Sequence, residues 1–138
     1  AYMDCKIITG DNIHTAAQVA LELKLGSQIC FLEKDEIVDE SGEPVLKLLP
    51  EHMLCMNGDQ IAGNKGLIEK CAVFARTNPG QKADVIAHLN DTRMTLMCGD
   101  GTNDVRGLKK AHVGLAIVNM PAKPEQPAGP VNPMQELT

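Results

Sequence analysis

Short, mostly apolar runs alternate with longer stretches of helical periodicity in the first part of the chain. Residues 5–8 form a run too short for a helix, and residues 13–25 then carry apolar side chains at helical spacing up to Gly26, the expected helix stop. A second short apolar run occupies 28–32. This order predicts a strand, a helix and a strand, a unit that pairs its strands in parallel through a right-handed crossover.

The same alternation returns in the second half of the chain. Short apolar runs at 72–75, 94–98 and 113–118 predict strands, and helices are predicted at 81–89 and 105–111. Strands that alternate with helices favour an α/β fold, in which a parallel sheet is flanked by helices on both faces.

The segment between these two parts, at about 33–70, is less regular. It opens on a charge run, Glu-Lys-Asp-Glu, that is typical of a solvated loop. A turn is predicted at 41–44, between short extended runs at 37–38 and 45–49. A possible strand at 54–56 precedes an Asn-Gly-Asp turn that would also fit a hairpin. We expect the segment to form a small, irregular excursion from the main sheet.

The character of the chain changes from residue 119 onward. Five of its eight prolines stand at positions 121, 124, 127, 130 and 133, and few apolar residues remain there to offset the entropy of ordering. Residues 119–138 are therefore predicted to be a flexible tail or linker, with a proline-rich ligand for another domain as the alternative. The folded part is expected at 1–118.

Length and charge limit the classes of protein that the chain can represent. Its 138 residues suffice for one domain with a core, which must be aliphatic because the chain has one Tyr, two Phe and no Trp. The net charge is −5 and the basic residues do not cluster, which argues against a nucleic-acid partner or an anionic membrane surface. No apolar run approaches the roughly 20 residues of a membrane-spanning helix, so a soluble protein is expected.

The five cysteines predict buried thiols rather than a disulfide framework. Their number is odd and no Cys-x-x-Cys spacing occurs, which favours reduced core residues in a reducing compartment. A zinc site is the alternative, although the four histidines are dispersed along the chain.

Polar residues follow three of the predicted strands. They are Thr9, Gly10 and Asp11 after the first, Arg76 and Lys82 after the strand at 72–75, and Asp100, Asn103 and Asp104 after the strand at 94–98. Because parallel strands end at one edge of a sheet, where ligands of open α/β sheets bind, we expect these groups to converge. A hydroxyl, an ammonium, carboxylates and backbone N–H groups suit Mg²⁺ and phosphate, and hence phosphoryl transfer. No nucleophile of the expected kind is evident, because every visible strand end is assigned.

Three motifs together resemble a known family. They are Thr9-Gly10-Asp11-Asn12, Phe74-Ala75-Arg76 followed by Pro79-x-Gln81-Lys82, and the run from Thr95 through Cys98-Gly99-Asp100-Gly101-Thr102-Asn103-Asp104. In this order and spacing they closely resemble the C-terminal half of the phosphorylation domain of P-type ATPases, which belong to the haloacid dehalogenase superfamily. The resemblance covers about residues 5–118 and implies a Rossmann-like but incomplete domain. The third motif is most similar to the type V-A branch of the endoplasmic reticulum, which is associated with dislocating misinserted transmembrane helices.

The resemblance implies that four of these residues contact the phosphoryl group. Thr9 and Gly10 would hold its oxygens, Lys82 would neutralise its charge, and Asn103 would also contact it. The pump that the resemblance implies would form an aspartyl-phosphate intermediate from ATP.

The remaining residues would serve the nucleotide and the metal ion. Asp11 would lie near the nucleotide and the domain hinge, and Arg76 near the nucleotide ribose. Asp100 would be the ligand of Mg²⁺, with Asp104 supporting the metal site.

The chain departs from the family pattern in ways that predict an inactive piece. The Asp-Lys-Thr-Gly-Thr segment with the phosphorylated aspartate is absent, as are the nucleotide-binding, actuator and transmembrane parts. Arg106 and Gly107 stand where the pattern usually has a small residue and then Ala. The parent would expose this part on the cytosolic face of a membrane, with the endoplasmic reticulum favoured. A stand-alone phosphatase of the same superfamily and a non-catalytic binding module are the alternatives.

Overall fold

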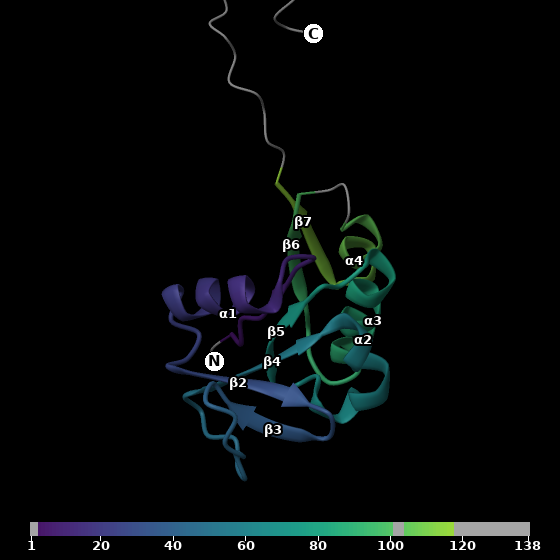
Figure 1. The fold of residues 1–138 in the computed structure, drawn as a ribbon. Helices are drawn as coiled ribbons and strands as arrows, with labels where there is room; N and C mark the ends of the chain where they lie inside the picture. Colours follow the sequence, from purple (N-terminus) through teal and green to yellow (C-terminus); the bar gives the residue numbers. More distant parts are fainter. Residues whose placement is uncertain (1–2, 101–103, 118–138) are drawn as a thin grey trace, which may run out of the picture.

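The computed structural model describes residues 3–100 and 104–117, which form a mostly parallel five-stranded sheet and a parallel two-stranded sheet with flanking helices (Figure 1). A five-stranded sheet has the order β1-β5-β4-β2-β3, and a separate two-stranded sheet contains β6 and β7. Along the chain the elements are β1 (Ile7–Ile8), α1 (Ile13–Glu22), β2 (Gln28–Glu33), β3 (Glu36–Asp39), β4 (His52–Asn57), α2 (Gly58–Ile61), the 3₁₀ helix η1 (Ala62–Leu67), β5 (Cys71–Ala75), α3 (Pro79–Asn90), β6 (Leu96–Gly99), α4 (Val105–Lys110) and β7 (Val113–Ala116). The predicted α/β class is confirmed.

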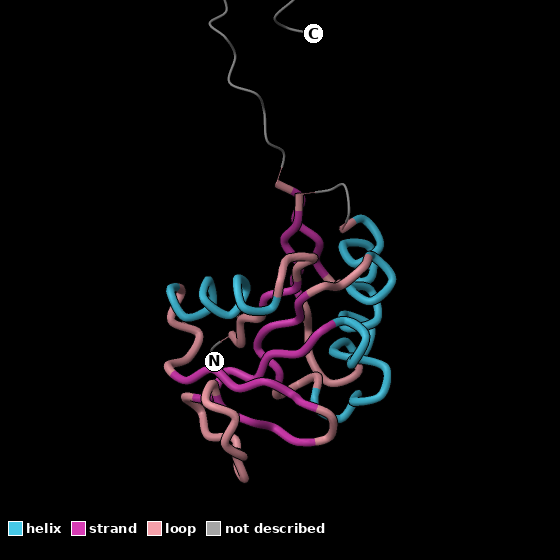
Figure 2. Tube along the Cα trace, viewed as in Figure 1, coloured by secondary structure: helices cyan, strands magenta, loops and turns pink. Residues whose placement is uncertain are grey.

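The five-stranded sheet has a buried cluster on each face. On one face, small side chains of α1, including Ala16, Ala17 and Ala20, pack against Met53 and Val73. Small residues let the helix approach the sheet closely. On the other face, larger side chains of α3 and the strands form the second cluster, which includes Leu54, Met56, Phe74, Val85 and Leu89. Helices therefore cover both faces, as predicted (Figure 2).

The end of α1 differs from the prediction. The helix ends at Glu22, and Lys24, with φ of 60°, adopts the left-handed conformation that closes it. Its N–H donates to the carbonyl of Leu21, and the N–H of Leu25 donates to that of Ala20, the pair of bonds expected of a Schellman cap. Gly26 is thus not the helix stop. A Cβ at Gly26 would collide with Met53 and lie 2.8 Å from the carbonyl of Glu51, so its small size allows close packing.

The prediction of an excursion from the main sheet at 33–70 is wrong for the most buried part of this segment, β4. β4 lies between β2 and β5 and is parallel to both, so it is a middle strand of the main sheet. Its four central residues, 53–56, are buried because both of its faces are covered. The charge run is exposed, as predicted for a solvated loop, and its two middle residues form the turn of the antiparallel hairpin between β2 and β3. The turn at 41–44 is present, residues 45–49 form no strand, and Asn57 caps α2 instead of turning a hairpin.

The strands β6 and β7 do not join the main sheet, contrary to the expectation of a single sheet. They pair in parallel with each other, and within the described residues nothing pairs with the other edge of β6. Leu96 is 60% exposed, and Val113 and Leu115 are 50% and 51% exposed, so one face of this unit lacks a cover. No strand in the described part of the chain lies between β1 and β6 to connect the two sheets.

The cysteine prediction holds for three residues and is wrong for two. Cys30, Cys55 and Cys71 are buried in the five-stranded unit, whereas Cys5 and Cys98 are exposed, and all five are free thiols. Cys98 lies on β6, on a face that nothing in the described ranges covers. The predicted tail at 119–138 lies outside the described residues. None of the helices in the described part of the chain is long and apolar enough to span a bilayer.

Candidate functional site

The loops that follow β1 and β5 are bonded to each other. The N–H of Arg76 donates to the carbonyl of Asp11 at 3.0 Å, and the N–H and hydroxyl of Thr77 both donate to the carbonyl of Thr9, at 3.0 and 2.8 Å. The hydroxyl of Thr9 accepts the N–H of Asp11 at 3.1 Å. Two of the three predicted strand ends therefore meet at the carboxyl edge of the sheet, as the parallel pairing of β1 and β5 requires.

Arg76 has an unusual backbone in this junction. Its φ of 52° lies in the left-handed region, which is uncommon for a side chain other than Gly, Asn or Asp. A Cβ at Gly58, the first residue of α2, would lie 2.6 Å from the carbonyl of Arg76, so the two segments are in close contact. This packing holds Arg76 in place, and its side chain is exposed. Strained backbone of this kind is concentrated at functional sites.

Helix α3 begins directly after this junction and positions Lys82. Asn78 accepts the N–H of Gln81 at 2.8 Å, and the Gln81 side chain accepts the N–H of Asn78 at 3.0 Å, which is a capping box with Pro79 at the first turn. Lys82 follows within the first turn and is only 8% exposed. A buried lysine so close to a helix start requires a counter-charge.

That counter-charge is Asp104, the residue before α4. The Nζ atom of Lys82 lies 2.6 Å from Oδ1 of Asp104, and the two side chains are 10% and 14% exposed. The pair joins the strand end after β5 to the strand end after β6, 22 residues further along the chain. A charge-assisted bond this short and shielded fixes the orientation of both groups.

Two glycines lie close to this ion pair, and one of them makes room for it. A Cβ at Gly99 would lie 2.5 Å from Oδ2 and 2.8 Å from Cβ of Asp104, so the carboxylate occupies the space that a side chain would fill. A Cβ at Gly107 would lie 2.7 Å from Sδ of Met97 and 3.8 Å from Cβ of Lys82, which places α4 tightly against β6 and α3. Gly99 therefore has a specific packing role, because its missing side chain leaves room for the Asp104 carboxylate.

Two carboxylates at this edge have the chemistry for a divalent cation. Asp100 is exposed and directly follows β6, and Asp104 is held against Gly99, the residue before Asp100, by its ion pair with Lys82. Hard carboxylate oxygens are the ligands that Mg²⁺ uses, usually one or two from the protein with the remainder from phosphate and water. Within the described ranges there is no cluster of three or more Asp, Glu, His or Cys. The arrangement fits Mg²⁺ held together with a phosphate group.

The structure thus brings the predicted residues together in two groups. Thr9, Gly10 and Asp11 are joined to Arg76, and Lys82 is joined to Asp104. Among the described residues, no hydrogen bond or ion pair links Thr9 directly to Lys82. Asn103 lies outside the described residues.

Two residues of the junction were missed by inspection of the sequence. Thr77 is 8% exposed and joins the two loops directly through its hydroxyl, which donates to the carbonyl of Thr9. A single Thr after a strand gives no signal of this in the sequence. Asn78 could have been found, because an Asn three residues before a Gln and directly before Pro is a helix-start signature.

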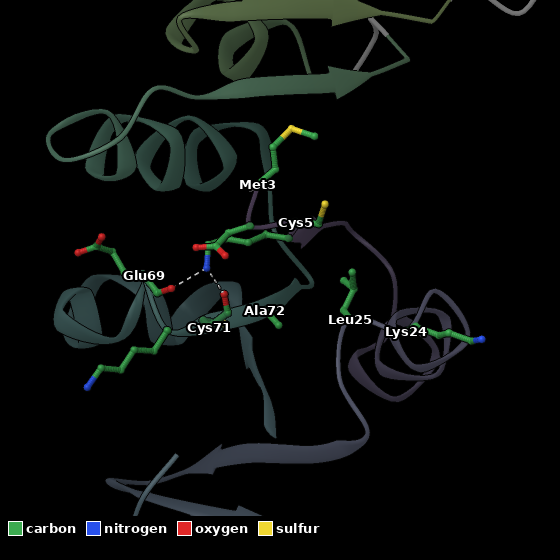
Figure 3. A pocket seen from close by; sticks show the side chains of 10 residues that line it. Met3, Cys5, Lys24, Leu25, Glu69, Cys71 and Ala72 are labelled. Carbon is green, nitrogen blue, oxygen red and sulfur yellow. Dashed lines mark hydrogen bonds between the residues drawn. The ribbon is translucent and has the colours of Figure 1, made fainter. Parts of the chain in front are cut away.

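The cavity shown in Figure 3 belongs to the opposite edge of the sheet. It has a volume of about 350 Å³ and is lined by residues that precede β1 and β5, including Lys6 and Glu69. Nζ of Lys6 donates to the carbonyls of Glu69 and Cys71 at 2.7 and 2.6 Å, and burial lowers the pKa of Lys6. Lys6 thereby ties β1 to the start of β5, and this cavity takes no part in the candidate site.

A larger groove separates the two sheets. Its volume is about 600 Å³. One side is lined by Ile8 of β1 and by residues that precede this strand, and the other side by residues 95–98 in and before β6. Ile86 and Leu89 of α3 also line it. The groove is predominantly apolar, and it lies where a strand would connect the two sheets into one.

These features define an α/β, Rossmann-like domain that is incomplete and has a charged site at the carboxyl edge of its strands. No family model matches the chain. It is 35% identical over 140 residues to an endoplasmic reticulum transmembrane helix translocase of Aspergillus fumigatus, covering 82% of the chain and 11% of that protein. It is 36% identical over 138 residues to a probable manganese-transporting ATPase of Arabidopsis thaliana, covering 84% and 12%. It is 31% identical over 115 residues to a plasma membrane-type calcium-transporting ATPase of rice, covering 81% and 9%.

The chain belongs to the P-type ATPases. It spans about one tenth of the length of the curated relatives that it matches. The family resemblance inferred from the three motifs is therefore confirmed.

Proposed function

We propose that this chain supplies the phosphoryl-stabilising part of a pump that couples ATP hydrolysis, through an aspartyl-phosphate, to movement of a substrate across a membrane. The observation that supports this most is the shielded pair of Lys82 and Asp104, at 2.6 Å, packed against Gly99, the residue before Asp100. Phosphoryl transfer depends mainly on positioning and on stabilising spread negative charge. A lysine and an aspartate that are held in a fixed orientation beyond the carboxyl ends of β5 and β6 are suited to stabilising a phosphoryl group.

Each residue in the proposed site has a distinct role. Thr9 and Gly10 bind phosphoryl oxygens, and Lys82 compensates the charge of the transferred group. Asn103, outside the described residues, contacts the same group in this proposal.

The nucleotide and the metal ion take the remaining groups. Asp11 lies near the nucleotide and the domain hinge, Arg76 contacts the ribose, and Asp100 holds Mg²⁺ with Asp104. The metal ion, when bound, neutralises phosphate charge. The hydrogen bond between the Arg76 and Asp11 backbones keeps the two nucleotide contacts in register.

The nucleophile comes, in this proposal, from a segment of the parent outside this chain. The apolar groove between β1 and β6, of about 600 Å³, can accept an extended strand. A strand parallel to β1 and β6 would end beside Thr9 and Gly99, at the edge where a carboxylate could attack. We expect this chain alone to be inactive for this reason.

We propose the endoplasmic reticulum as the location of the parent, with this part on the cytosolic face. Relatives from Aspergillus fumigatus and Saccharomyces cerevisiae, 35% and 33% identical to the chain, are both named endoplasmic reticulum transmembrane helix translocases. Dislocation of transmembrane helices is thus the favoured activity of the parent. Cation transport is the second candidate, because the relative from Arabidopsis thaliana is 36% identical and is named a probable manganese-transporting ATPase.

Binding of inorganic phosphate with Mg²⁺ to this chain tests the site. In an NMR titration of the labelled chain, the amides of Thr9, Lys82 and Asp100 should shift together. Lys82→Ala should abolish the phosphate-dependent shifts, whereas Lys109→Ala, which removes an exposed charge from the last turn of α4, should leave them unchanged. Shifts scattered over other regions, or shifts that survive Lys82→Ala, would contradict the proposal.

A peptide complementation experiment tests the groove. A synthetic peptide with an apolar run followed by Asp-Lys-Thr-Gly-Thr should shift the groove residues Ile8, Ile86 and Leu96 when added to the chain. A scrambled peptide of the same composition is the control. Equal shifts with both peptides would show that the groove selects no particular strand, and the nucleophile would then have to enter elsewhere.

A further inference from the structure

The carbonyl oxygen of Thr9 accepts two hydrogen bonds, and both come from Thr77. The hydroxyl of Thr77 donates at 2.8 Å and its N–H at 3.0 Å. Thr77 and Lys82, each 8% exposed, are the two buried polar residues in the described part of the chain, and both lie beyond the carboxyl end of β5. Burial of a hydroxyl is unfavourable unless the group is hydrogen-bonded, so the bond to Thr9 accounts for the placement of the Thr77 side chain.

The carbonyl that accepts these bonds shares a peptide unit with the N–H of Gly10. A trans peptide is planar and directs its C=O and its N–H to opposite sides, and the described residues contain no cis peptide. The two bonds from Thr77 therefore turn the N–H of Gly10 away from the loop after β5, and Gly10 is exposed. No hydrogen bond between described residues uses this N–H, which leaves it as a donor for a ligand.

The bonds from Thr77 improve this donor in two ways. Connected hydrogen bonds polarise one another, so a carbonyl that accepts two bonds makes the N–H of its own peptide a stronger donor. The direction of the N–H is also fixed before a ligand arrives, which reduces the cost of ordering the loop on binding. Beside it, the Thr9 hydroxyl accepts the N–H of Asp11 at 3.1 Å and keeps its own proton for donation.

We propose that Thr77 is a positioning residue for phosphate: through the carbonyl of Thr9 it orients the N–H of Gly10 and strengthens it as a donor to a phosphoryl oxygen. This inference rests on the proposed function and adds a residue that controls the affinity of the site without touching the ligand. The hydroxyl is the decisive group, because Thr77→Val nearly preserves the shape of the side chain and retains the bond from the backbone N–H.

Titration of the labelled chain with inorganic phosphate and Mg²⁺, followed by NMR, tests this role. In Thr77→Val the Gly10 amide proton should move upfield before phosphate is added, because its peptide unit is less polarised. The affinity for phosphate should fall about fivefold, the factor that one neutral hydrogen bond contributes. Thr77→Ser keeps a hydroxyl at this position and should restore most of the affinity together with the Gly10 signal.

Thr92→Val is the matched control, since it removes a hydroxyl that donates to Glu69 at 3.1 Å, beyond the other end of α3. It should change neither the Gly10 amide nor the affinity. A hydroxyl that serves stability alone would lower the urea midpoint of Thr77→Val and leave the affinity and the Gly10 amide unchanged, and that result would overturn the inference. A loss of affinity that Thr77→Ser does not reverse would overturn it as well. If phosphate binds Lys82→Ala as tightly as the unmodified chain, or binds neither, the proposed function itself fails and this inference fails with it.

Discussion

The two β-units of the molecule differ in how completely they are covered. In the five-stranded unit, helices lie on both faces, and Phe74 and Met53 are fully buried. In the β6–β7 unit, α4 covers one face only, and Leu115 on the other face is 51% exposed. The first unit has a buried core between its two layers of helices, while the second has an apolar face and a strand edge that none of the described residues covers.

This difference matters because the candidate site draws on both units. Thr9 and Arg76 come from the complete unit, and Asp100 and Asp104 come from the incomplete one. The ion pair of Lys82 and Asp104 is a direct connection between them. The site therefore depends on a junction that the five-stranded core alone cannot stabilise.

The largest effect is expected from truncating the core of the complete unit. Phe74→Ala should lower the free energy of unfolding by about 3–5 kcal/mol, since it removes a fully buried aromatic side chain and leaves a cavity. Leu115→Ala, the matched change in the incomplete unit, should alter it by no more than about 0.5 kcal/mol. Urea denaturation followed by circular dichroism measures both. Similar losses in the two variants would mean that the exposed face is in fact covered.

Breaking the junction between the units should have the next largest effect. Lys82→Met leaves the shielded carboxylate of Asp104 without its partner and should destabilise the chain by about 1–3 kcal/mol. Arg93→Met is the control, because its pair with Asp4 is about half exposed and should contribute less than about 1 kcal/mol. The same denaturation experiment compares the two. An equal loss from both variants would contradict a special role for the junction.

The two glycines beside the ion pair should respond differently to a methyl group. Gly99→Ala places Cβ against the fixed carboxylate of Asp104 and should cost about 1–3 kcal/mol, with displaced Lys82 and Asp104 signals in NMR spectra. Gly107→Ala meets the flexible end of Met97 and gains up to about 1 kcal/mol of helix propensity, so its net effect should be close to zero. Loss of the ion pair in Gly107→Ala but not in Gly99→Ala would reverse this interpretation.

The sequence predicted the elements of the complete unit well because each has a local signal. The period of α1 and the apolar runs of β2 and β5 identify them. The sequence also placed Lys82 and Asp104 at strand ends. That the two residues lie near each other could be expected only because parallel strands end at one edge of a sheet. Their 2.6 Å contact is seen only in the folded chain.

Long-range relations explain what the sequence could not predict. The segment that forms β4 was expected to lie outside the main sheet, because an apolar run in the sequence does not reveal which strands will be its neighbours. The separate β6–β7 sheet had no signal either, since the local pattern of a strand does not show that no described strand lies between it and β1. Cys98 was expected in a core for the same reason: its local apolar run is typical of a buried strand, and the exposure arises from an absent layer.

The smallest effect on the free energy of unfolding at neutral pH is expected from the ionisation of the buried cysteines. Burial raises the pKa of Cys55 and of Cys71 to about 12, so both thiols stay neutral in the folded chain while unfolded cysteines ionise near their ordinary value of 9.0. The contribution of these two thiols to the free energy of unfolding is fully present below pH 9 and is lost as the pH rises from 9 toward 12. The urea midpoint should therefore be nearly constant from pH 7 to 8 and fall between pH 9 and 10.5. A Cys55→Val, Cys71→Val variant should show a smaller fall, and a fall of the same size would assign the effect to other groups. A thiol-specific reagent at pH 8 should label Cys5 and Cys98 quickly and the three buried thiols only after unfolding. Cys5 precedes β1, so the comparison of the two units rests on Cys98 of β6 against Cys30, Cys55 and Cys71 of the five-stranded unit.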